Sequence, residues 1–482
     1  MKKRVLFINP GKNDYFTVGR IHMGQTLLGG MLKRQGHEVL VMDYAFLRGL
    51  RGNIRVPEIE EVVETFKPDV IGITVFTYVY NECLSMIERI SMSTDAPIIL
   101  GGPHFIMFPG DFGSDTRISY LVRGEAEDVI KDLVVTAKKE KTPVSIDCTL
   151  PSPEGIPAVN LDIAYGSEFL SDYQIQLSRG CPFDCTFCNV KMVAGKRVRL
   201  RDLSLCVRQI IEAKKRYPNI RTISITDDVP TINKNRFKEF LKMLKNANLD
   251  CELTVDNVRA DLIDEEMIGL YVSAGGQNIC LGVESGHPEV FEMTHKGESL
   301  EKIAVAAKLI RKHGLTLGMC FVIGLPGDNL KRHMASLRFA KTLKPDYAFW
   351  NMCVPWPFTE VRQWYEKNGT IGELRNFSTL IDPMVNYQSP PAFTAQFPPE
   401  DRIKAWLMAN MQTYWFDIRS LGKLAREAAR YGLYRPLLIF AFGKTLHTIK
   451  MRLEFLARNF KQFGLYFTAG KVLRKLRQHA RI

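Results

Sequence analysis

The chain has 482 residues, enough for two or three domains, and hydrophobic residues make up 46% of it, as in ordinary soluble proteins. No apolar run approaches the ~18 residues of a membrane span, and residues 1–4 lead straight into a strand-like run, so neither a membrane helix nor a targeting segment is predicted. The net charge of +13 is local: residues 402–482 hold 17 Lys and Arg against 3 Asp and Glu, and the remainder holds 48 against 49, which excludes a generally basic protein.

Residues 1–140 are predicted to form a parallel α/β domain. Continuous apolar runs typical of buried strands alternate with helical segments, which indicates a sheet covered on both faces. Glycines follow several of the runs, where they suit a ligand that lies across the carboxyl edge of the sheet. The expected fold is Rossmann-like, of the flavodoxin-like kind. The predicted strands are residues 5–8, 39–42, 70–75, 97–100 and 119–122, and the predicted helices are residues 27–34 and 81–90.

Residues 141–170 are predicted to be a linker. Pro143, Pro151, Pro153 and Pro157 fall within this short stretch, and Glu154-Gly155 lies between them. Such a composition joins domains and does not fill one.

Residues 171–370 carry a second series of alternating strands and helices. Six such repeats are too few for the eight of a closed TIM barrel, so an open partial (βα)6 barrel is expected. The predicted strands are residues 174–178, 222–226, 252–255, 279–283, 317–323 and 347–351, and the predicted helices are residues 204–217, 233–247, 264–274, 299–313 and 330–343.

A run of three cysteines, Cys181, Cys185 and Cys188, follows the first of these strands with the spacing C-x3-C-x2-C. A cubane 4Fe–4S cluster with full protein ligation takes four thiolates, so three leave one iron open to a substrate or cofactor. A zinc site would need a second C-x2-C pair, which does not follow. A disulfide does not suit a chain expected in the cytoplasm.

This cysteine run resembles that of the radical S-adenosylmethionine (SAM) superfamily. The resemblance implies that SAM chelates the open iron, and that an electron from the cluster cleaves it to methionine and a 5′-deoxyadenosyl radical. Phe187, just before the third cysteine, matches the family position beside the adenine. The electron donor implied is a reductant such as a flavodoxin or ferredoxin.

Polar groups at later strand ends extend the resemblance. Asp227 and Asp228 follow the second barrel strand, where relatives hold the methionine amine of SAM, and a pair that caps a helix is the alternative. Glu284 and Ser285, in the run Gly-Val-Glu-Ser-Gly, resemble the fourth-strand motif, and Gly324 lets the backbone approach the adenine closely. All five are predicted to contact SAM.

The N-terminal domain resembles the cobalamin-binding domain that precedes many radical SAM barrels. Cobalamin-dependent mutases and methionine synthase-like proteins use a motif D-x-H-x-x-G whose His ligates cobalt. This chain lacks that motif, so cobalamin is expected without a histidine ligand to cobalt, and His22 is either a corrin contact or an ordinary loop residue. A flavodoxin-like domain without cobalamin is the alternative. The residues predicted to contact cobalamin are Asn9, Gly24, Thr74, Gly101, Gly102, Arg123, Gly124 and Glu125.

Together the resemblances imply a cobalamin-dependent radical SAM enzyme that methylates an unactivated carbon, through a 5′-deoxyadenosyl radical and methylcobalamin. A faint resemblance of residues 428–436 to tails of porphyrin-cyclase-like and hopanoid-type members favours a hydrophobic lipid, isoprenoid or tetrapyrrole-like substrate. One alternative is a ring-forming or rearranging enzyme. The other is a sensor that binds SAM and cobalamin without turnover.

Residues 371–482 are predicted to form a basic, mainly helical region. Leu446, Ile449, Leu453, Leu456, Phe460 and Phe463 recur at helical steps and form one apolar stripe beside Lys and Arg. Such a helix either packs on the open barrel or docks on an anionic membrane, which would place a cytoplasmic protein at the inner membrane face. Nucleic acid is not an expected partner.

Overall fold

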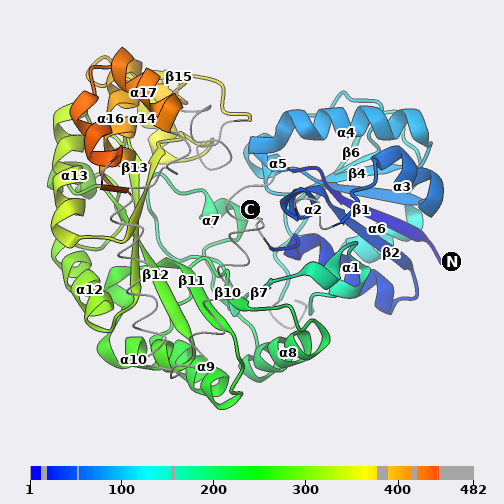
Figure 1. Cartoon of the computed structure of the whole chain (residues 1–482). Helices are drawn as coiled ribbons and strands as arrows, with labels where there is room; N and C mark the ends of the chain where they lie inside the picture. The colour runs from blue at the N-terminus through cyan, green and yellow to red at the C-terminus, as the bar shows by residue number, and fades with distance from the viewer. Residues whose placement is uncertain are drawn as a thin grey trace.

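A computed structural model of the chain describes residues 2–11, 19–50, 54–152, 158–376, 389–413, 421–441 and 443–444. The chain forms two parallel α/β units that lie side by side (Figure 1). The expected fold class, a Rossmann-like domain followed by a partial barrel, is confirmed.

The N-terminal unit is a six-stranded parallel sheet in the order β2-β1-β3-β4-β5-β6. Its centre is wholly buried, because β1 and β3 are runs of apolar and β-branched residues that helices cover on both faces. The strands are β1 (Arg4–Asn9), β2 (Glu38–Asp43), β3 (Val70–Thr74), β4 (Ile98–Gly101), β5 (Tyr120–Arg123) and β6 (Val144–Asp147). The helices are α1 (Met23–Arg34), α2 (Tyr44–Gly49), α3 (Ile59–Phe66), α4 (Tyr80–Ser93), α5 (His104–Met107) and α6 (Ile130–Thr136).

The predicted linker is more ordered than its prolines indicate. Strand β6 lies within it and pairs with β5 at the sheet edge, and this strand was missed because its side chains are largely exposed and polar. Farther along, Leu161, Ile163 and Leu170 are buried, and Ala164 bridges to Val41 of β2. The connection therefore packs on the first unit.

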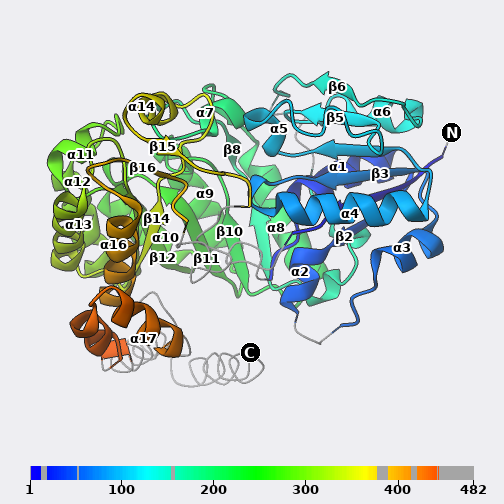
Figure 2. The same cartoon turned by 90° about the horizontal axis from the view of Figure 1, so that it is seen from above.

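The second unit is a curved parallel sheet in the order β14-β13-β12-β11-β10-β7, with helices on its outside (Figures 1 and 2). Among the described residues β7 and β14 are its two edges, so the six-stranded barrel is open, as predicted. The strands are β7 (Asp172–Ile175), β10 (Thr222–Ile225), β11 (Glu252–Val258), β12 (Gly276–Glu284), β13 (Thr316–Ile323) and β14 (Tyr347–Met352).

Six helices on the outside of the barrel begin with a side-chain cap, which fixes the turn that leads into each helix. The caps Asp202, Asn233, Asp264, Ser299, Asn329 and Thr359 each accept a hydrogen bond from a backbone N–H three residues on. The helices are α8 (Leu203–Arg216), α9 (Lys234–Asn246), α10 (Glu265–Ser273), α12 (Leu300–Lys312), α13 (Leu330–Leu343) and α14 (Glu360–Asn368).

The two faces of the barrel sheet differ in polarity. Ile223, Leu253 and Leu317, at one set of alternate positions, belong to the core beneath the helices. The other set carries polar groups on the inner face: Ser224 lies 2.8 Å from Thr254 across β10 and β11, and Asn278 donates to Tyr347 across the barrel. The barrel interior is therefore polar along β10 and β11, whereas Cys280, Cys320 and Phe349 make it less polar along β12 to β14.

The C-terminal region begins with the short strands β15 (Thr370–Ile371) and β16 (Ala392–Phe393). Helix α16 (Pro399–Gln412) then covers β14 and packs beside α13, and α17 (Leu421–Arg430) follows (Figure 2). The stripe from Leu446 to Phe463 lies outside the described residues. Within the described part, no helix has the length and apolarity needed to cross a membrane.

Candidate active site between the two sheets

The cysteine loop lies at the carboxyl end of β7 and is held by its backbone. Strands β8 (Ser178–Arg179) and β9 (Arg199–Leu200) pair at its base, and the Cys181 N–H donates to Gly195 O at 3.0 Å. Gly180 has φ +96°, and a Cβ there would lie 2.4 Å from Arg197 O, so only glycine fits this turn. Thr186 joins the loop to the barrel by donating its N–H to Thr294 O.

The three thiols of the loop are buried or half-buried, and burial raises the pKa of each, that of Cys185 to about 12. Iron binding would therefore have to displace a proton from each of these thiols. Among described residues no group of three metal-binding side chains converges on a single ion. A cubane needs no such convergence, because each thiolate binds a different iron. Three free thiols on one loop fit a site-differentiated cluster.

Asp227 and Asp228 brace the cysteine loop. Asp227 accepts hydrogen bonds from the Leu177 N–H (2.7 Å) and the Ser178 hydroxyl (2.5 Å), and Asp228 accepts one from the Gly180 N–H (2.8 Å). Asp227 is fully buried, and burial raises its pKa to about 7. Its side chain thus braces the start of the cysteine loop, and the contact of Asp227 with SAM stays a prediction. Asp228 does line the cavity described below.

The orientation of the Glu284 side chain is set by an irregularity at the end of β12. The register between β12 and β13 shifts between Gly282 and Glu284, and Glu284 has φ +65°, a conformation that bulky residues rarely adopt. Its carboxylate pairs with the buried Lys296 ammonium at 2.9 Å. Burial acts to lower the pKa of Lys296, but Glu284 and Glu298 raise it above its ordinary value. A charged pair at a strained strand end is a candidate binding element.

Arg259 connects that pair to the cysteine loop. Its guanidinium lies 3.6 Å from the ring centroid of Phe183, which stands between the first two cysteines. It also donates to Lys296 O at 2.8 Å and pairs with Asp261. The sequence places Arg259 at a strand end, but nothing in it identifies Phe183 as the partner.

Of the other three predicted SAM residues, Ser285 and Gly324 directly follow β12 and β13, and Phe187 lies in the cysteine loop. Ser285 is buried, and its hydroxyl lies 3.1 Å from that of Ser336, so it supports the turn after β12. Gly324 ends β13 with φ +85°. Phe187 is half-buried and packs on an apolar cluster that includes Leu325. The structure thus brings Phe187 and Gly324 to one side of the loop and Glu284 to another.

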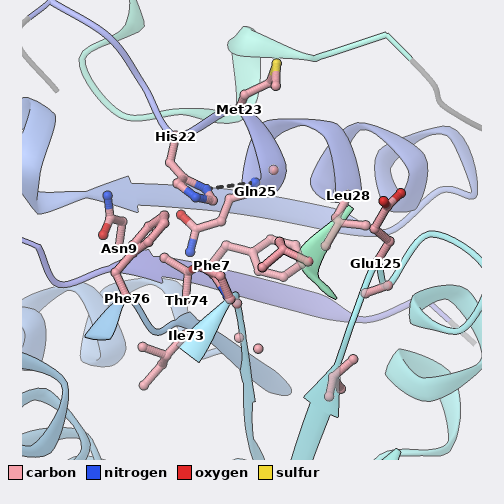
Figure 3. Close-up of a pocket in the computed structure, with 18 of the residues that line it drawn as sticks. Phe7, Asn9, His22, Met23, Gln25, Leu28, Ile73, Thr74, Phe76 and Glu125 are labelled. Carbon is pink, nitrogen blue, oxygen red and sulfur yellow. Dashed lines mark hydrogen bonds between the residues drawn. The ribbon is translucent and has the colours of Figure 1, made fainter. Parts of the chain in front are cut away.

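A cavity of about 650 Å³ lies between the two units (Figure 3). Its walls in the N-terminal unit are apolar and glycine-rich, and its barrel walls include Gln174, Gln176 and Thr226. A Cβ at Gly101 would meet nothing closer than 3.9 Å, so glycine leaves the cavity floor open there. Seven of the eight residues predicted to contact cobalamin line it: Asn9, Gly24, Thr74, Gly101, Gly102, Gly124 and Glu125.

Arg123 is the exception. It does not belong to the cavity wall, and its guanidinium pairs with the exposed Asp147 of β6 at 2.6 Å. The pairing of Arg123 with β6 could not be foreseen because that strand was not predicted, and the contact of Arg123 with cobalamin stays a prediction. A cavity of this size among glycines and apolar side chains, with polar groups such as Glu125 in its wall, fits a corrin ring.

His22 lies over this cavity at the start of α1 (Figure 3). Its Nδ1 accepts a hydrogen bond from the Gln25 N–H at 3.2 Å, and its ring meets Phe76 edge to face. Burial lowers the pKa of His22 to about 4, so the ring is neutral near pH 7. With Nδ1 as acceptor, the one proton sits on Nε2, which then has no lone pair for a metal.

Ion pairs between the units, which sequence reasoning missed, close the cavity rim. Glu125 accepts from Arg179 at 2.5 Å and from Arg199 at 2.9 Å, and Glu127 accepts from Arg179 at 2.6 Å. Glu127, Arg179 and Arg199 are 5–11% exposed and Glu125 13%, so water screens the pairs little. We call these four residues the interdomain network. Since Arg179 precedes Gly180 and Cys181, the network joins the first unit to the cysteine loop.

Comparison with known proteins supports both halves of this arrangement. A profile of the radical SAM superfamily matches residues 175–340, and a profile of the B12 binding domain matches residues 21–134. An uncharacterized methyltransferase of Pyrococcus horikoshii is 26% identical over 75% of this chain and 82% of its own. An anaerobic magnesium-protoporphyrin IX monomethyl ester cyclase of Rubrivivax gelatinosus is 25% identical over 75% of this chain and 69% of its own.

Two solved structures share the fold across both units. TsrM from Kitasatospora setae, a radical S-adenosylmethionine methyltransferase with cobalamin and a [4Fe–4S] cluster bound, aligns over 75% of this chain and 77% of its own, with 20% identity and a TM-score of 0.59. OxsB, a cobalamin-dependent S-adenosylmethionine radical enzyme with aqua-cobalamin and S-adenosylmethionine bound, aligns over 99% of this chain and 75% of its own, with 17% identity and a TM-score of 0.61. At these identities the likeness is one of fold.

Proposed function

Since this chain belongs to the radical SAM enzymes that carry a B12-binding domain, we propose that it is a C-methyltransferase that uses a 4Fe–4S cluster, SAM and cobalamin. One observation carries the proposal. The glycine-lined cavity of the first unit extends to Gln176, Arg179 and Asp228, which adjoin or brace the cysteine loop. Groups bound at the two sites would therefore face one shared space.

Some of these residues would bind the 4Fe–4S cluster or cobalamin, and others shape the cavity between the two units. Cys181, Cys185 and Cys188 would hold the cluster, and Asp228 fixes the loop that presents them. Asn9, Gly24, Thr74, Gly101, Gly102, Gly124 and Glu125 would surround cobalamin. When bound, the cluster supplies the electron that cleaves SAM and cobalamin carries the methyl group.

SAM is proposed to lie between the cysteine loop and the ends of β12 and β13. Glu284, paired with Lys296, suits a zwitterionic methionine group because it offers both signs of charge in a buried place. Phe187 and Gly324 suit the adenine, which needs an apolar face and a close backbone. Ser285 supports the turn that follows β12, through its contact with the Ser336 hydroxyl.

The barrel interior bears on the substrate. The hydrophobic substrate expected from the sequence rests on a faint tail resemblance and stays a prediction. Gln174, Gln176 and Thr226 line the barrel side of the cavity. Buried polar groups require partners, so this wall favours a substrate with hydrogen-bonding groups near the reacting carbon. A ring-forming reaction, as the cyclase name of one relative indicates, is the second candidate.

We expect the reduced, cluster-loaded protein to convert SAM into both S-adenosylhomocysteine and 5′-deoxyadenosine. The reason is that methyl transfer through cobalamin consumes one SAM as methyl donor and a second as radical source. Both products can be quantified by chromatography and mass spectrometry in the presence and absence of cobalamin. Deoxyadenosine without S-adenosylhomocysteine would favour the ring-forming candidate. Intact SAM, with iron and sulfide present in cluster amounts, would favour a sensor without turnover.

We expect cobalamin to bind without an imidazole ligand to cobalt. The neutral His22 ring accepts at Nδ1, so its Nε2 proton blocks coordination. Electron paramagnetic resonance of the Co(II) form tests this, because a coordinated imidazole splits the cobalt lines through its nitrogen nucleus. His22→Gln provides the control: its spectrum should match that of the parent protein. A nitrogen splitting that disappears in His22→Gln would refute the expectation.

The remaining expectations about partners stay predictions. A flavodoxin or ferredoxin as electron donor follows from the cluster chemistry. Membrane docking depends on residues 445–482, which the structure does not describe, as does the location at the inner membrane face.

A further inference from the structure

Arg402 is the largest charged side chain that is fully buried in the described part of the chain. It stands in the first turn of α16, outside both profile matches, yet its guanidinium lies against the end of β13. A Cβ built on Gly324 would lie 2.0 Å from Arg402 Nη1 and 2.4 Å from its Cζ. The Arg402 guanidinium therefore occupies the space that a side chain at position 324 would need.

Arg402 is bonded to the Gly324 backbone through one intermediary. Its Nη2 donates to the Tyr365 hydroxyl at 2.5 Å, and that hydroxyl donates to Gly324 O. Its Nε donates to Phe397 O at 3.0 Å, which fixes the guanidinium to the start of α16. On the opposite side, the Gly324 N–H donates to Asp328 at 2.8 Å. Both polar groups of the Gly324 backbone are thus held by buried partners.

Charge reinforces this arrangement. Asp328 is buried, and its attraction to Arg402 partly offsets the burial that raises its pKa to about 6. Tyr365 also belongs to the apolar cluster of Leu325, Cys353, Val361 and Ala392, on which Phe187 packs. The contacts therefore run from α16 through Tyr365 to the residue that precedes the third cysteine.

We infer that Arg402 is a positioning residue for SAM: through Tyr365 it sets the Gly324 backbone and the Phe187 ring that would flank the adenine. The inference rests on the proposed function and adds to it a contribution from the C-terminal region. A buried cation is costly to retain without a specific role, and here one of its hydrogen bonds reaches the end of β13 through Tyr365 while its Nη1 fills the space beside Gly324. Arg402 itself need not touch SAM.

The test measures SAM affinity in protein that holds its cluster. Arg402→Met removes the charge and every N–H donor of the guanidinium at similar side-chain length. Tyr365→Phe removes only the hydroxyl bridge and keeps the ring in its apolar cluster. Lys404→Met is the matched control, because Lys404 lies on the same helix, is 34% exposed and pairs with Asp401 alone. Equilibrium dialysis with radiolabelled SAM gives Kd, and the change that SAM causes in the paramagnetic resonance of the reduced cluster gives a second readout.

We expect Arg402→Met and Tyr365→Phe to raise the Kd for SAM by about tenfold or more, since small misplacements of binding groups have large effects. Iron, sulfide and cobalamin content should stay at the parental level, and Lys404→Met should match the parent. Parental Kd values in Tyr365→Phe, even if Arg402→Met fails to fold, would show that Arg402 only anchors α16. If the parent protein with an intact cluster binds no SAM, the proposed function fails instead.

Discussion

Alanine in place of Cys185 is expected to abolish the 4Fe–4S cluster and, with it, all SAM cleavage. Each thiolate of the loop would be the sole protein ligand of one iron, so the loss of any one leaves two irons open. Cys181→Ala and Cys188→Ala should behave alike. The N-terminal unit should stay folded, because its sheet and core do not involve the loop. Iron and sulfide analysis with visible absorbance after anaerobic reconstitution measures the effect.

Cys251→Ala is the matched control for these variants. Cys251 belongs to the same unit but lies before β11, at the end of the barrel opposite the cysteine loop, where its thiol faces Ile220 O. It should keep a full cluster. A triple alanine variant of the loop that still acquired a cubane would show that the ligands lie elsewhere.

The second large effect is expected from Glu125→Ala in the interdomain network. The change leaves Arg199 buried without a carboxylate partner and leaves Arg179 with Glu127 alone. Breaking a buried ion pair from one side costs about 3–5 kcal/mol, far more than the typical surface pair. We expect the free energy of unfolding to fall by about that amount and cobalamin to be lost on gel filtration, because Glu125 also lines the cavity.

Arg123→Ala tests whether the effect is specific to the interdomain network. Arg123 lies two residues before Glu125 but forms an ordinary surface ion pair. Asp147, the partner of Arg123, is 75% exposed, so this change should cost less than about 1 kcal/mol. Denaturant unfolding of both variants and their cobalamin absorbance provide the comparison. Equal stabilities would mean that the network contributes no more than a surface contact. Loss of cobalamin in Arg123→Ala alone would support the role first expected for Arg123.

The barrel and the cysteine loop could be predicted because their signals are local. The buried strands appear in the sequence as alternating or continuous runs of apolar residues. The three cysteines of the loop lie within a stretch of eight residues. Strand β6 escaped prediction because an exposed edge strand has no apolar run to mark it. Asp227 follows a strand end as expected, but its hydrogen bonds to Leu177 and Ser178, about fifty positions away, could not be predicted from the local sequence.

The residues that were missed act over long sequence separations. Glu125 and Arg199 are 74 positions apart, and Arg402 and Tyr365 are 37 apart. In the local sequence, Glu125, Arg199 and Arg402 resemble ordinary surface charges. Tyr365 resembles any aromatic residue of a helix. Only the packing of α16 on β14 and of the first unit on the barrel shows that these side chains are buried and paired. Pairing of this kind has no signature in periodicity or spacing.

The braces on the cysteine loop have a consequence for how this protein is made and maintained. Asp227, Asp228, Gly195 and Thr294 hold the loop through bonds to its backbone that involve no iron. Small zinc domains, by contrast, fold only as their metal binds. The loop backbone of a chain braced in this way can reach its final conformation after synthesis and before the cluster is inserted. Oxygen that dissolves the cluster would likewise leave an intact polypeptide, ready for repair by refilling and not destined for degradation.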